Sequence, residues 1–184
     1  MRTFVAAPCP PEPPLGNTLL GALSRRHWRL VPQDRRHITL RFLGEVPDAR
    51  VPELAGRLGR VAARAPFDLT VRGCGAFPDG RRPDVLWLGC GAGGEALAAL
   101  AEAVGDALGL DPEGRPFRGH VTVARRRADT PPAAAATALA EHLPRWRETD
   151  WGAFRVERVE LLASELGPAG PRYTVLATVP LLVR

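Results

Sequence analysis

The sequence contains no lysine, so all 25 of its basic residues are arginine. Without lysine, the glycine-rich segment 91–94 cannot belong to a phosphate-binding P-loop, which ends in Gly-Lys-Ser/Thr, and we interpret it as a turn. The net charge of +5 and the pI near 10.3 suit an anionic partner. Guanidinium groups bind phosphate in a bidentate way that lysine cannot match. A chain rich in Ala, Gly, Pro and Arg is also typical of high-GC coding, so basicity alone is weak support for nucleic-acid binding.

Cysteine is also scarce, with three residues that are scattered along the chain: Cys9, Cys74 and Cys90. They form no C-x-x-C pair, which argues against a disulfide framework and against a zinc site. No His-x-x-x-His pair or carboxylate cluster offers other metal ligands. We therefore expect no metal and no cofactor, and a reducing cytoplasm as the place of action.

Long apolar runs are missing too. The N-terminal apolar stretch of five residues is too short for the core of a signal peptide, and no run approaches the roughly 18–20 apolar residues of a membrane span. Apolar residues make up 45% of the chain and charged residues 24%, which is ordinary for a globular protein. We expect a soluble, monomeric protein with one domain over residues 1–184.

Periodicity predicts both strands and helices. Frequent hairpins favour an α+β fold with antiparallel sheets over a doubly wound parallel sheet. Strands are expected at 2–6, 28–31, 36–43, 67–76, 85–90, 120–124, 154–163 and 172–182, and helices at 15–23, 48–65, 95–108 and 130–143.

Two of the predicted strands begin with the same pattern. The segments 37–40 (HITL) and 120–123 (HVTV) are both His-apolar-Thr-apolar. Because residues i and i+2 of a strand face the same way, His37 shares a face with Thr39, and His120 with Thr122. One His-x-Thr is common and usually without function. Two copies that use two of only four histidines are more informative. His27 and His142 lie near predicted helix ends and are interpreted as structural or surface residues.

The paired pattern suits acid–base chemistry on a phosphate. A histidine with a pKa near about 6.5 can donate or accept a proton at neutral pH, and a threonine hydroxyl can hold a phosphoryl oxygen. If the two strands face each other across a cleft, one histidine protonates a leaving oxygen while the other activates water. The residues alone do not say which histidine has which task.

The segments HITLRFLGEV (37–46) and PFRGHVTVAR (116–125) resemble the paired signatures of the 2H phosphoesterase superfamily. More narrowly, they resemble the RNA 2′,3′-cyclic phosphodiesterases, once named 2′-5′ RNA ligases. The likeness extends to RTFVA at the start, to 75–89 and to 160–181. It implies a bilobal fold in which two antiparallel sheets, backed by helices, are related by a pseudo-two-fold axis around a central cleft. It also implies that His37 is the proton donor, that His120 is the proton acceptor, and that the product is a 2′-phosphate.

Three further residues are weaker candidates. An arginine at the position of Arg125 resembles a phosphate contact of the family, but strict alternation points it away from the cleft unless a bulge follows Ala124. Arg41 has the parity of His37 and Thr39, so geometry favours it as a source of positive potential. Phe4 is a candidate for stacking a base, with core packing as the alternative. Family members often have proline before the second histidine, where this chain has Gly119.

The function expected from the resemblance is hydrolysis of 2′,3′-cyclic phosphates at RNA ends, with RNA such as tRNA fragments as the partner. Two alternatives keep the chemistry: 2′-5′ ligation of RNA, and opening of a small cyclic nucleotide. A third is a non-catalytic RNA-binding module, which would not need two titratable groups at matched positions.

Overall fold

The computed structural model describes residues 1–12, 14–167 and 170–182 as an α+β fold built on antiparallel strands. The strands form one hydrogen-bonded series in the order β7-β4-β5-β6-β3-β1-β8-β9, and β2 pairs with β6. Their bounds are β1 (Arg2–Pro8), β2 (Trp28–Leu30), β3 (His37–Glu45), β4 (Phe67–Phe77), β5 (Val85–Cys90), β6 (His120–Arg126), β7 (Asp150–Val156), β8 (Arg158–Gly167) and β9 (Gly170–Pro180).

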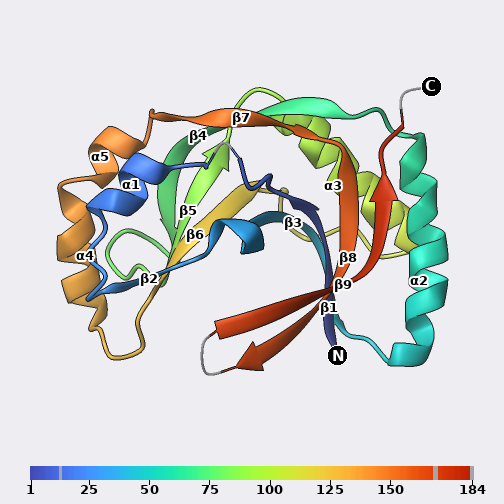
Figure 1. Cartoon of the computed structure of the whole chain (residues 1–184), viewed down its shortest axis with the longest axis horizontal. Coiled ribbons are helices and arrows are strands. Elements are labelled where there is room, and N and C mark those ends of the chain that lie inside the picture. The colour runs from blue at the N-terminus through green and yellow to red at the C-terminus, as the bar shows by residue number, and fades with distance from the viewer. Residues whose placement is uncertain (13, 168–169, 183–184) are drawn as a thin grey trace.

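The helices lie at the two ends of the molecule, with the strands between them (Figure 1). The helices α1, α4 and α5 flank one half, and α2 and α3 flank the other. Their bounds are α1 (Asn17–Ala22), α2 (Val51–Leu58), α3 (Gly94–Leu108), α4 (Pro132–Ala140) and α5 (Leu143–Trp146), with short 3₁₀ turns η1 (Gln33–Arg35), η2 (Asp48–Arg50) and η3 (Gly59–Ala63). No helix in the described part of the chain is long and apolar enough to cross a membrane.

The series divides into two lobes at one narrow junction. Lobe one contains β3, β1, β8 and β9, and lobe two contains β6, β5, β4, β7 and β2. The strands β3 and β6 meet at a single pair, Ile38 opposite Val121. The two expected sheets are therefore joined by this one pair into a single nine-stranded sheet, at the point where the two His-x-Thr strands begin.

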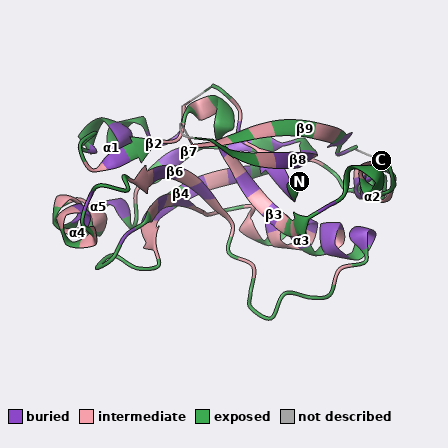
Figure 2. Cartoon of the chain, turned by 90° about the horizontal axis from the view of Figure 1, so that it is seen from below, coloured by how far each residue is buried: buried purple, intermediate pink, exposed green. Residues whose placement is uncertain are grey.

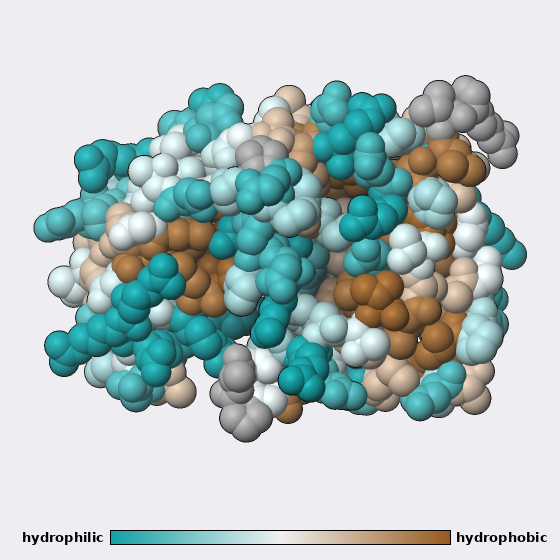
Figure 3. Space-filling model, viewed as in Figure 1, coloured by the Kyte–Doolittle hydropathy of each residue, from teal (hydrophilic) through white to brown (hydrophobic). Residues whose placement is uncertain are grey.

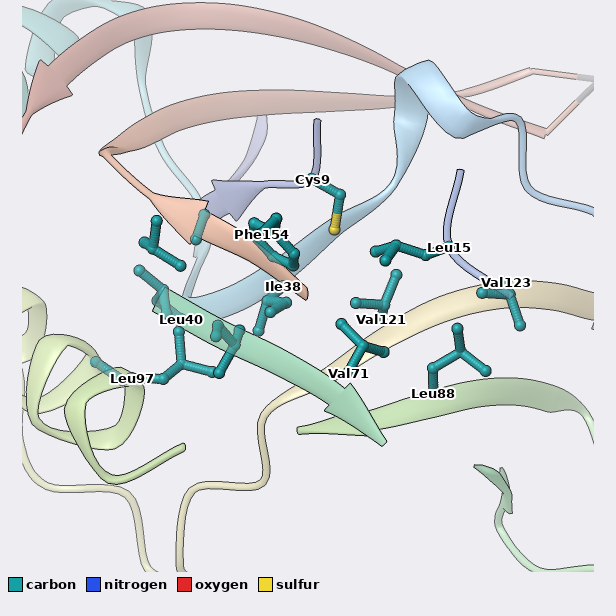
Figure 4. Packing of buried hydrophobic residues seen from close by; sticks show 14 of the residues in the cluster. Cys9, Leu15, Ile38, Leu40, Val71, Leu88, Leu97, Val121, Val123 and Phe154 are labelled. Atoms are coloured by element: carbon teal, nitrogen blue, oxygen red, sulfur yellow. The ribbon is translucent and has the colours of Figure 1, made fainter. Parts of the chain in front are cut away.

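Buried apolar residues continue across this junction. Ile38 and Val121 are fully buried, and Figure 4 shows Leu40 and Val123 in the same packed cluster. In Figure 2 the buried positions run along the middle of the strands, whereas the loop between α3 and β6 is mostly exposed. The alternation predicted for the two His-x-Thr motifs is confirmed at 37–40 and 120–123, where all four apolar residues lie in the core.

Most predicted elements are found within a few residues of their expected bounds. The strand predicted at 154–163 is wrong, because the chain forms two strands there, β7 and β8. The strand β7 pairs with β4 in lobe two, and β8 pairs with β1 in lobe one, so the chain changes lobes at Glu157. The helix predicted at 130–143 also divides, into α4 and α5, and the second of these has Pro144 in its first turn. The region 48–65 is helical only at 51–58, with 3₁₀ turns on either side.

Candidate active site

A cavity of about 740 Å³ lies between the lobes and brings both predicted motifs together. His37 and Thr39 line it from β3, and His120 and Thr122 line it from β6. Among its described lining residues the only fully charged side chains are arginines, and none is acidic. These are Arg2, Arg29, Arg35 and Arg125. The cavity is therefore a positively charged enclosure around two imidazoles, which suits an anionic ligand.

The register between β3 and β6 arranges the four motif residues crosswise. Directly opposite residues of an antiparallel pair point to the same side of the sheet. Ile38 and Val121 are the one pair that joins the strands, and continuation of its register brings position 39 next to position 120 and position 122 next to position 37. By this register each histidine has a threonine of its own strand two residues away and a threonine of the other lobe at the neighbouring position.

Both strands contain a bulge directly after the threonine, and the bulge reverses their alternation. In β6, Thr122 lies opposite Trp87 but Ala124 lies opposite Leu86, so Val123 has no partner in the ladder. This shift places Arg125 on the cavity side, where it lines the space beside Thr122. The position of Arg125 agrees with the resemblance and not with strict alternation, and the bulge lies at Val123–Ala124, before the position at which we expected it.

The bulge in β3 has the opposite effect on Arg41. Ala6 lies opposite Thr39, and Val5 lies opposite Arg41, so Leu40 is skipped. The side chain of Arg41 therefore turns away from the cavity, where it packs against Gly105 of α3 and pairs with Glu113 at 3.5 Å. The prediction that Arg41 adds positive potential to the cleft is wrong, because that prediction assumed unbroken alternation.

Each histidine packs against two aromatic rings. The ring centroid of His37 is 5.0 Å from that of Phe4 and 5.1 Å from that of Tyr173. Phe4 is only 4% exposed, since it packs against His37, Tyr173 and Phe42. Phe4 therefore packs against the His37 ring as part of a buried cluster. With so little exposed surface it offers no face on which a base could stack, in contrast to the expectation.

His120 has a similar aromatic setting in the other lobe. Its ring centroid is 5.1 Å from that of Phe77 and 6.3 Å from that of Trp87. The indole of Trp87 lies over two glycines, because an added Cβ would come within 2.3 Å of the ring at Gly75 and within 3.5 Å of it at Gly89. These glycines allow the indole to lie flat on the sheet beside His120.

Each histidine makes the same backbone hydrogen bond. Nδ1 of His37 is 3.0 Å from the carbonyl oxygen of Arg35, and Nδ1 of His120 is 2.7 Å from the carbonyl oxygen of Arg118. A carbonyl can only accept, so Nδ1–H is the donor in both rings. In the neutral form this leaves Nε2 as a proton acceptor, and in the charged form Nε2–H is a donor. Both rings are thus prepared to exchange a proton through Nε2.

Burial disfavours the charged form of both rings. It lowers the pKa of His37 below its usual value, and the carbonyl of Arg35 opposes this shift. Burial likewise lowers the pKa of His120, again opposed by its backbone carbonyl. The positive charge of Arg125 contributes to the lowered pKa of both imidazoles, so one arginine lies within electrostatic range of the two.

Arg36 fixes the backbone immediately before the first motif. Its side chain is buried and donates to the carbonyl oxygens of Val31 at 3.0 Å and Leu15 at 2.9 Å, and to the side chain of Gln33. These bonds hold the connection that leads into β3, and with it the start of the strand on which His37 lies.

Gly119, immediately before His120, occupies a crowded position. A Cβ there would lie 2.6 Å from Leu97 and 3.1 Å from the sulfur of Cys90. Gly119, at the position where family members often have proline, therefore lies where α3 and β5 pack closely against the start of β6. No side chain fits at this position without a shift of its neighbours.

Four aromatic residues at the site were not predicted from the sequence: Phe42, Phe77 and Tyr173, which line the cavity, and Trp87, which lies beside His120. Tyr173 is the only tyrosine in the chain, and it lies in a segment that resembles the family, which is the signal that could have identified it. His142 lies outside this cavity and stacks on Trp146 at 4.7 Å, in line with the structural role expected for it.

The three cysteines are free thiols in the part of the chain that the structure describes. Burial raises the pKa of Cys9 and of Cys74 to about 12, and that of Cys90 to about 11. At neutral pH these thiols are protonated, so they are poor nucleophiles.

The chain matches a family model described as the 2′-5′ RNA ligase superfamily over residues 11–168. A protein of Aeropyrum pernix named RNA 2′,3′-cyclic phosphodiesterase is 34% identical to it, over 82% of this chain and 85% of the relative. One of the same name from Thermus thermophilus is 35% identical, over 96% of this chain and 88% of the relative.

Solved structures show the same fold. The crystal structure of TT0787 of Thermus thermophilus has a TM-score of 0.75 and 32% identity, with 98% of each chain covered. That of E. coli LigT complexed with 3′-AMP has a TM-score of 0.72 and 27% identity, and covers 98% of this chain and 97% of the other.

Proposed function

The chain belongs to the 2′-5′ RNA ligase superfamily, and on that basis we propose that it hydrolyses the 2′,3′-cyclic phosphate at the 3′ end of RNA and leaves a 2′-phosphate. The observation that carries the proposal is the pairing of two His-x-Thr strands around one positively charged cavity. Both imidazoles offer Nε2 to the same space, as a two-histidine acid–base reaction requires.

In the proposed mechanism the phosphate lies between the two histidines. His120, in its neutral form, takes a proton from water through Nε2 as the water oxygen attacks phosphorus. His37, in its charged form, gives its Nε2 proton to the 3′ oxygen as the P–O3′ bond breaks. Each proton transfer of this kind contributes about 10²–10⁴-fold to the rate. No step requires a metal or a cofactor.

The hydroxyls of Thr39 and Thr122 bind the non-bridging phosphate oxygens from the two lobes. Arg125 adds a positive charge at the same position, where negative charge increases in the transition state. These groups hold the phosphate in line between the acid and the base.

The proposed partner is RNA with a 2′,3′-cyclic phosphate end, including fragments of tRNA. The protein is proposed to act as a monomer, since one chain supplies both histidines and both threonines. The free thiols of Cys9, Cys74 and Cys90 fit action in the reducing cytoplasm.

Ligation is the second candidate, and the family name favours it. If an RNA 5′-hydroxyl replaces water at His120, the same residues form a 2′-5′ linkage. The excess of water makes hydrolysis the main reaction.

The proposal is tested with an oligoribonucleotide that ends in a 2′,3′-cyclic phosphate, incubated with the protein in EDTA. We expect a 2′-phosphate end. His37→Ala and His120→Ala should each lower kcat by about 10²–10⁴-fold. Thr39→Ala and Thr122→Ala should raise KM by about tenfold or more, because each removes a hydrogen bond to a charged group.

Two variants outside the cavity serve as controls. His142→Ala and Thr137→Ala should retain the activity of the wild type, since neither residue lines the cavity. An unchanged cyclic end with the wild-type protein, or full activity in both catalytic variants, would contradict the proposal. Loss of activity in EDTA that zinc restores would contradict the metal-free mechanism.

A further inference from the structure

A second cavity of about 440 Å³ adjoins the catalytic one at His120. The two cavities share two lining residues, His120 and Phe77, whereas His37 and both threonines line the catalytic cavity and not the second. The second cavity, which we call the side pocket, therefore begins at the histidine that takes the proton of the nucleophile in the proposed mechanism.

The register of lobe two places the side pocket beside His120 on the catalytic face of the sheet. Gly89 of β5 lies opposite His120 of β6, and Trp87 lies opposite Thr122, so these residues point to the same side. An added Cβ at Gly89 would lie 2.7 Å from the carbonyl oxygen of Arg72 on β4. The pocket thus extends from the catalytic histidine across β5 to β4, over about 10 Å of sheet.

Charge distinguishes the side pocket from an ordinary surface hollow. Hydrophilic side chains are spread over much of the surface in the view of Figure 3, so a single exposed arginine is not a sign of a site. Around the side pocket, three arginines from separate segments come together, and no described lining residue is acidic: Arg72, Arg118 and Arg147. Arg72 is paired with Glu148 at 3.1 Å. Arg118 and Arg147 form no ion pair within the part of the chain that the structure describes.

Arg118 links this charge to the catalytic ring. It lies at the end of the exposed loop between α3 and β6 (Figure 2), and its backbone carbonyl accepts from Nδ1 of His120 at 2.7 Å. Burial lowers the pKa of His120, and the positive charge of Arg118 lowers it further. The guanidinium of Arg118 is therefore within electrostatic range of the ring that activates the nucleophile.

Hydrolysis does not need the side pocket. In-line attack places the nucleophile opposite the leaving 3′ oxygen, so the nucleophile enters on the side of His120. The rest of the hydrolysed RNA is attached to the ribose and not to the nucleophile. A water molecule occupies about 30 Å³, whereas sites for small ligands occupy about 300–1,000 Å³. At about 440 Å³, the side pocket has room for a nucleophile as large as a nucleotide.

We propose that the side pocket binds the nucleotide at the 5′-hydroxyl end of a second RNA strand, and that Arg118 and Arg147 contact the phosphate on the 3′ side of that nucleotide. The inference rests on the proposed function and adds a binding site for its ligation reaction. An anionic strand fits better than a neutral alcohol, because two guanidinium groups at the pocket have no carboxylate partner.

The joining step needs no further reactant. The 5′ oxygen of the second strand bonds to phosphorus and gives its proton to Nε2 of His120. The P–O3′ bond breaks, and the 3′ oxygen takes the Nε2 proton of His37. The product is a 2′-5′ phosphodiester with a free 3′-hydroxyl, and every atom of the two strands is retained.

The test measures how the cyclic phosphate divides between joining and hydrolysis. An oligoribonucleotide with a 2′,3′-cyclic phosphate end is incubated with one of two acceptors at equal concentration. These are adenosine and the dinucleotide ApA, which has the same 5′-hydroxyl nucleoside and one phosphate on its 3′ side. The ratio of 2′-5′-joined product to 2′-phosphate product should be about tenfold higher with ApA, because charged groups strengthen the hydrogen bonds to the phosphate.

Arg147→Gln should lower the ratio with ApA by about tenfold, to near the ratio with adenosine. Arg147 is the better choice for substitution, because Arg118 lies close to the catalytic histidine in the chain. Arg145→Gln is the matched control: it removes the same charge two residues away, and Arg145 lines neither cavity. Its ratios should equal those of the wild type with both acceptors.

Three results would overturn the side pocket as the site of the second strand: no joined product, equal ratios with the two acceptors in the wild type, or an unchanged ratio in Arg147→Gln. In each of them a 2′-phosphate product would leave the proposed function intact. A wild-type protein that forms neither product would overturn the proposed function itself.

Discussion

At the scale of single residues, one backbone carbonyl defines the chemistry of each histidine. The carbonyls of Arg35 and Arg118 accept from Nδ1–H in the same way, so the two rings have the same tautomer and the same free nitrogen. The rings themselves therefore do not distinguish acid from base. The difference must come from the groups around the rings, which are not the same in the two lobes, since Arg125 lines the cavity from lobe two.

The roles of His37 as proton donor and His120 as proton acceptor can be tested with a substrate in which sulfur replaces the 3′ oxygen. A thiolate leaves without protonation, because the pKa of a thiol is about 8.5, far below that of an alcohol. His37→Ala should therefore lose much less than the expected 10²–10⁴-fold on the sulfur substrate, whereas His120→Ala should lose the same factor on both. Single-turnover rates measure these ratios, and the reverse pattern would exchange the two roles.

The parity rule for strands predicted the four motif residues and their shared face, and the structure places all four in one cavity. It failed beyond the threonines, at Arg41 and at Arg125. A bulge changes the face of every later residue, and neither bulge contains a glycine or another residue that marks it in the sequence. The burial of Phe4 was equally hidden, since it depends on Tyr173 from a strand that lies far away in the sequence.

At the scale of elements, the hairpin of β4 and β5 places one wall of the site. Gly75 and Gly89 lie beneath the indole of Trp87, which packs against Phe77 at 5.3 Å, and both rings lie beside His120. The two glycines are thus part of the catalytic geometry, although neither has a side chain.

Gly75→Ala should disturb this wall. An added Cβ would lie 2.3 Å from the indole, which is rigid and must shift. We expect a loss of about 1–3 kcal/mol in the free energy of unfolding, together with a lower kcat because the ring is displaced towards His120. Urea denaturation and hydrolysis rates measure the two effects.

Gly56→Ala is the control for this prediction. Gly56 lies in α2, where an added Cβ meets nothing within 4 Å. This change should stabilise the protein by about 0.5–1 kcal/mol and leave kcat unchanged. If the Gly75→Ala protein were as stable and as active as the wild type, the prediction would be wrong, because the hairpin would then accept a shift of the Trp87 indole without cost.

The periodicity of the sequence predicted which segments form helices and strands, but it did not predict where one element ends and the next begins. The sequence at 154–163 is apolar enough for one strand, but its two parts pair with strands of different lobes. Such a division depends on which strands the two parts pair with in the folded protein, and no residue in the local sequence indicates it. The second half of the region 48–65 likewise forms a 3₁₀ turn against β9 and α3, and not a longer helix.

At the scale of the whole molecule, the interface between the lobes buries two ionisable rings, and this affects global stability. Burial lowers the pKa of His37 and of His120 in the folded protein. Below the usual histidine pKa of about 6.5, the unfolded chain therefore binds more protons than the folded one. Stability should be constant above about pH 7 and should fall as the pH drops below about 6.5.

Urea unfolding between pH 7.5 and pH 5 would measure this dependence. The slope should be smaller when His37 and His120 are both replaced by glutamine. It should persist in Thr39→Val, which changes the same cavity without removing a titrating group. The window lies above the usual range of carboxylates, so Asp and Glu contribute little to it. An unchanged slope in the double variant would refute the prediction.

The order of strands in lobe one also matters while the protein is being made. The strand β1 lies between β3 and β8, yet β8 begins at Arg158, after all of lobe two. On the ribosome, β1 can pair with β3 early, but its other edge has no partner until β8 has left the exit tunnel. Nascent chains stalled before that point carry both catalytic histidines beside an open, apolar strand edge, which is the kind of surface that other chains and chaperones capture. Tyr173, which packs against His37, is translated later still, so the catalytic wall of lobe one is completed only near the end of synthesis.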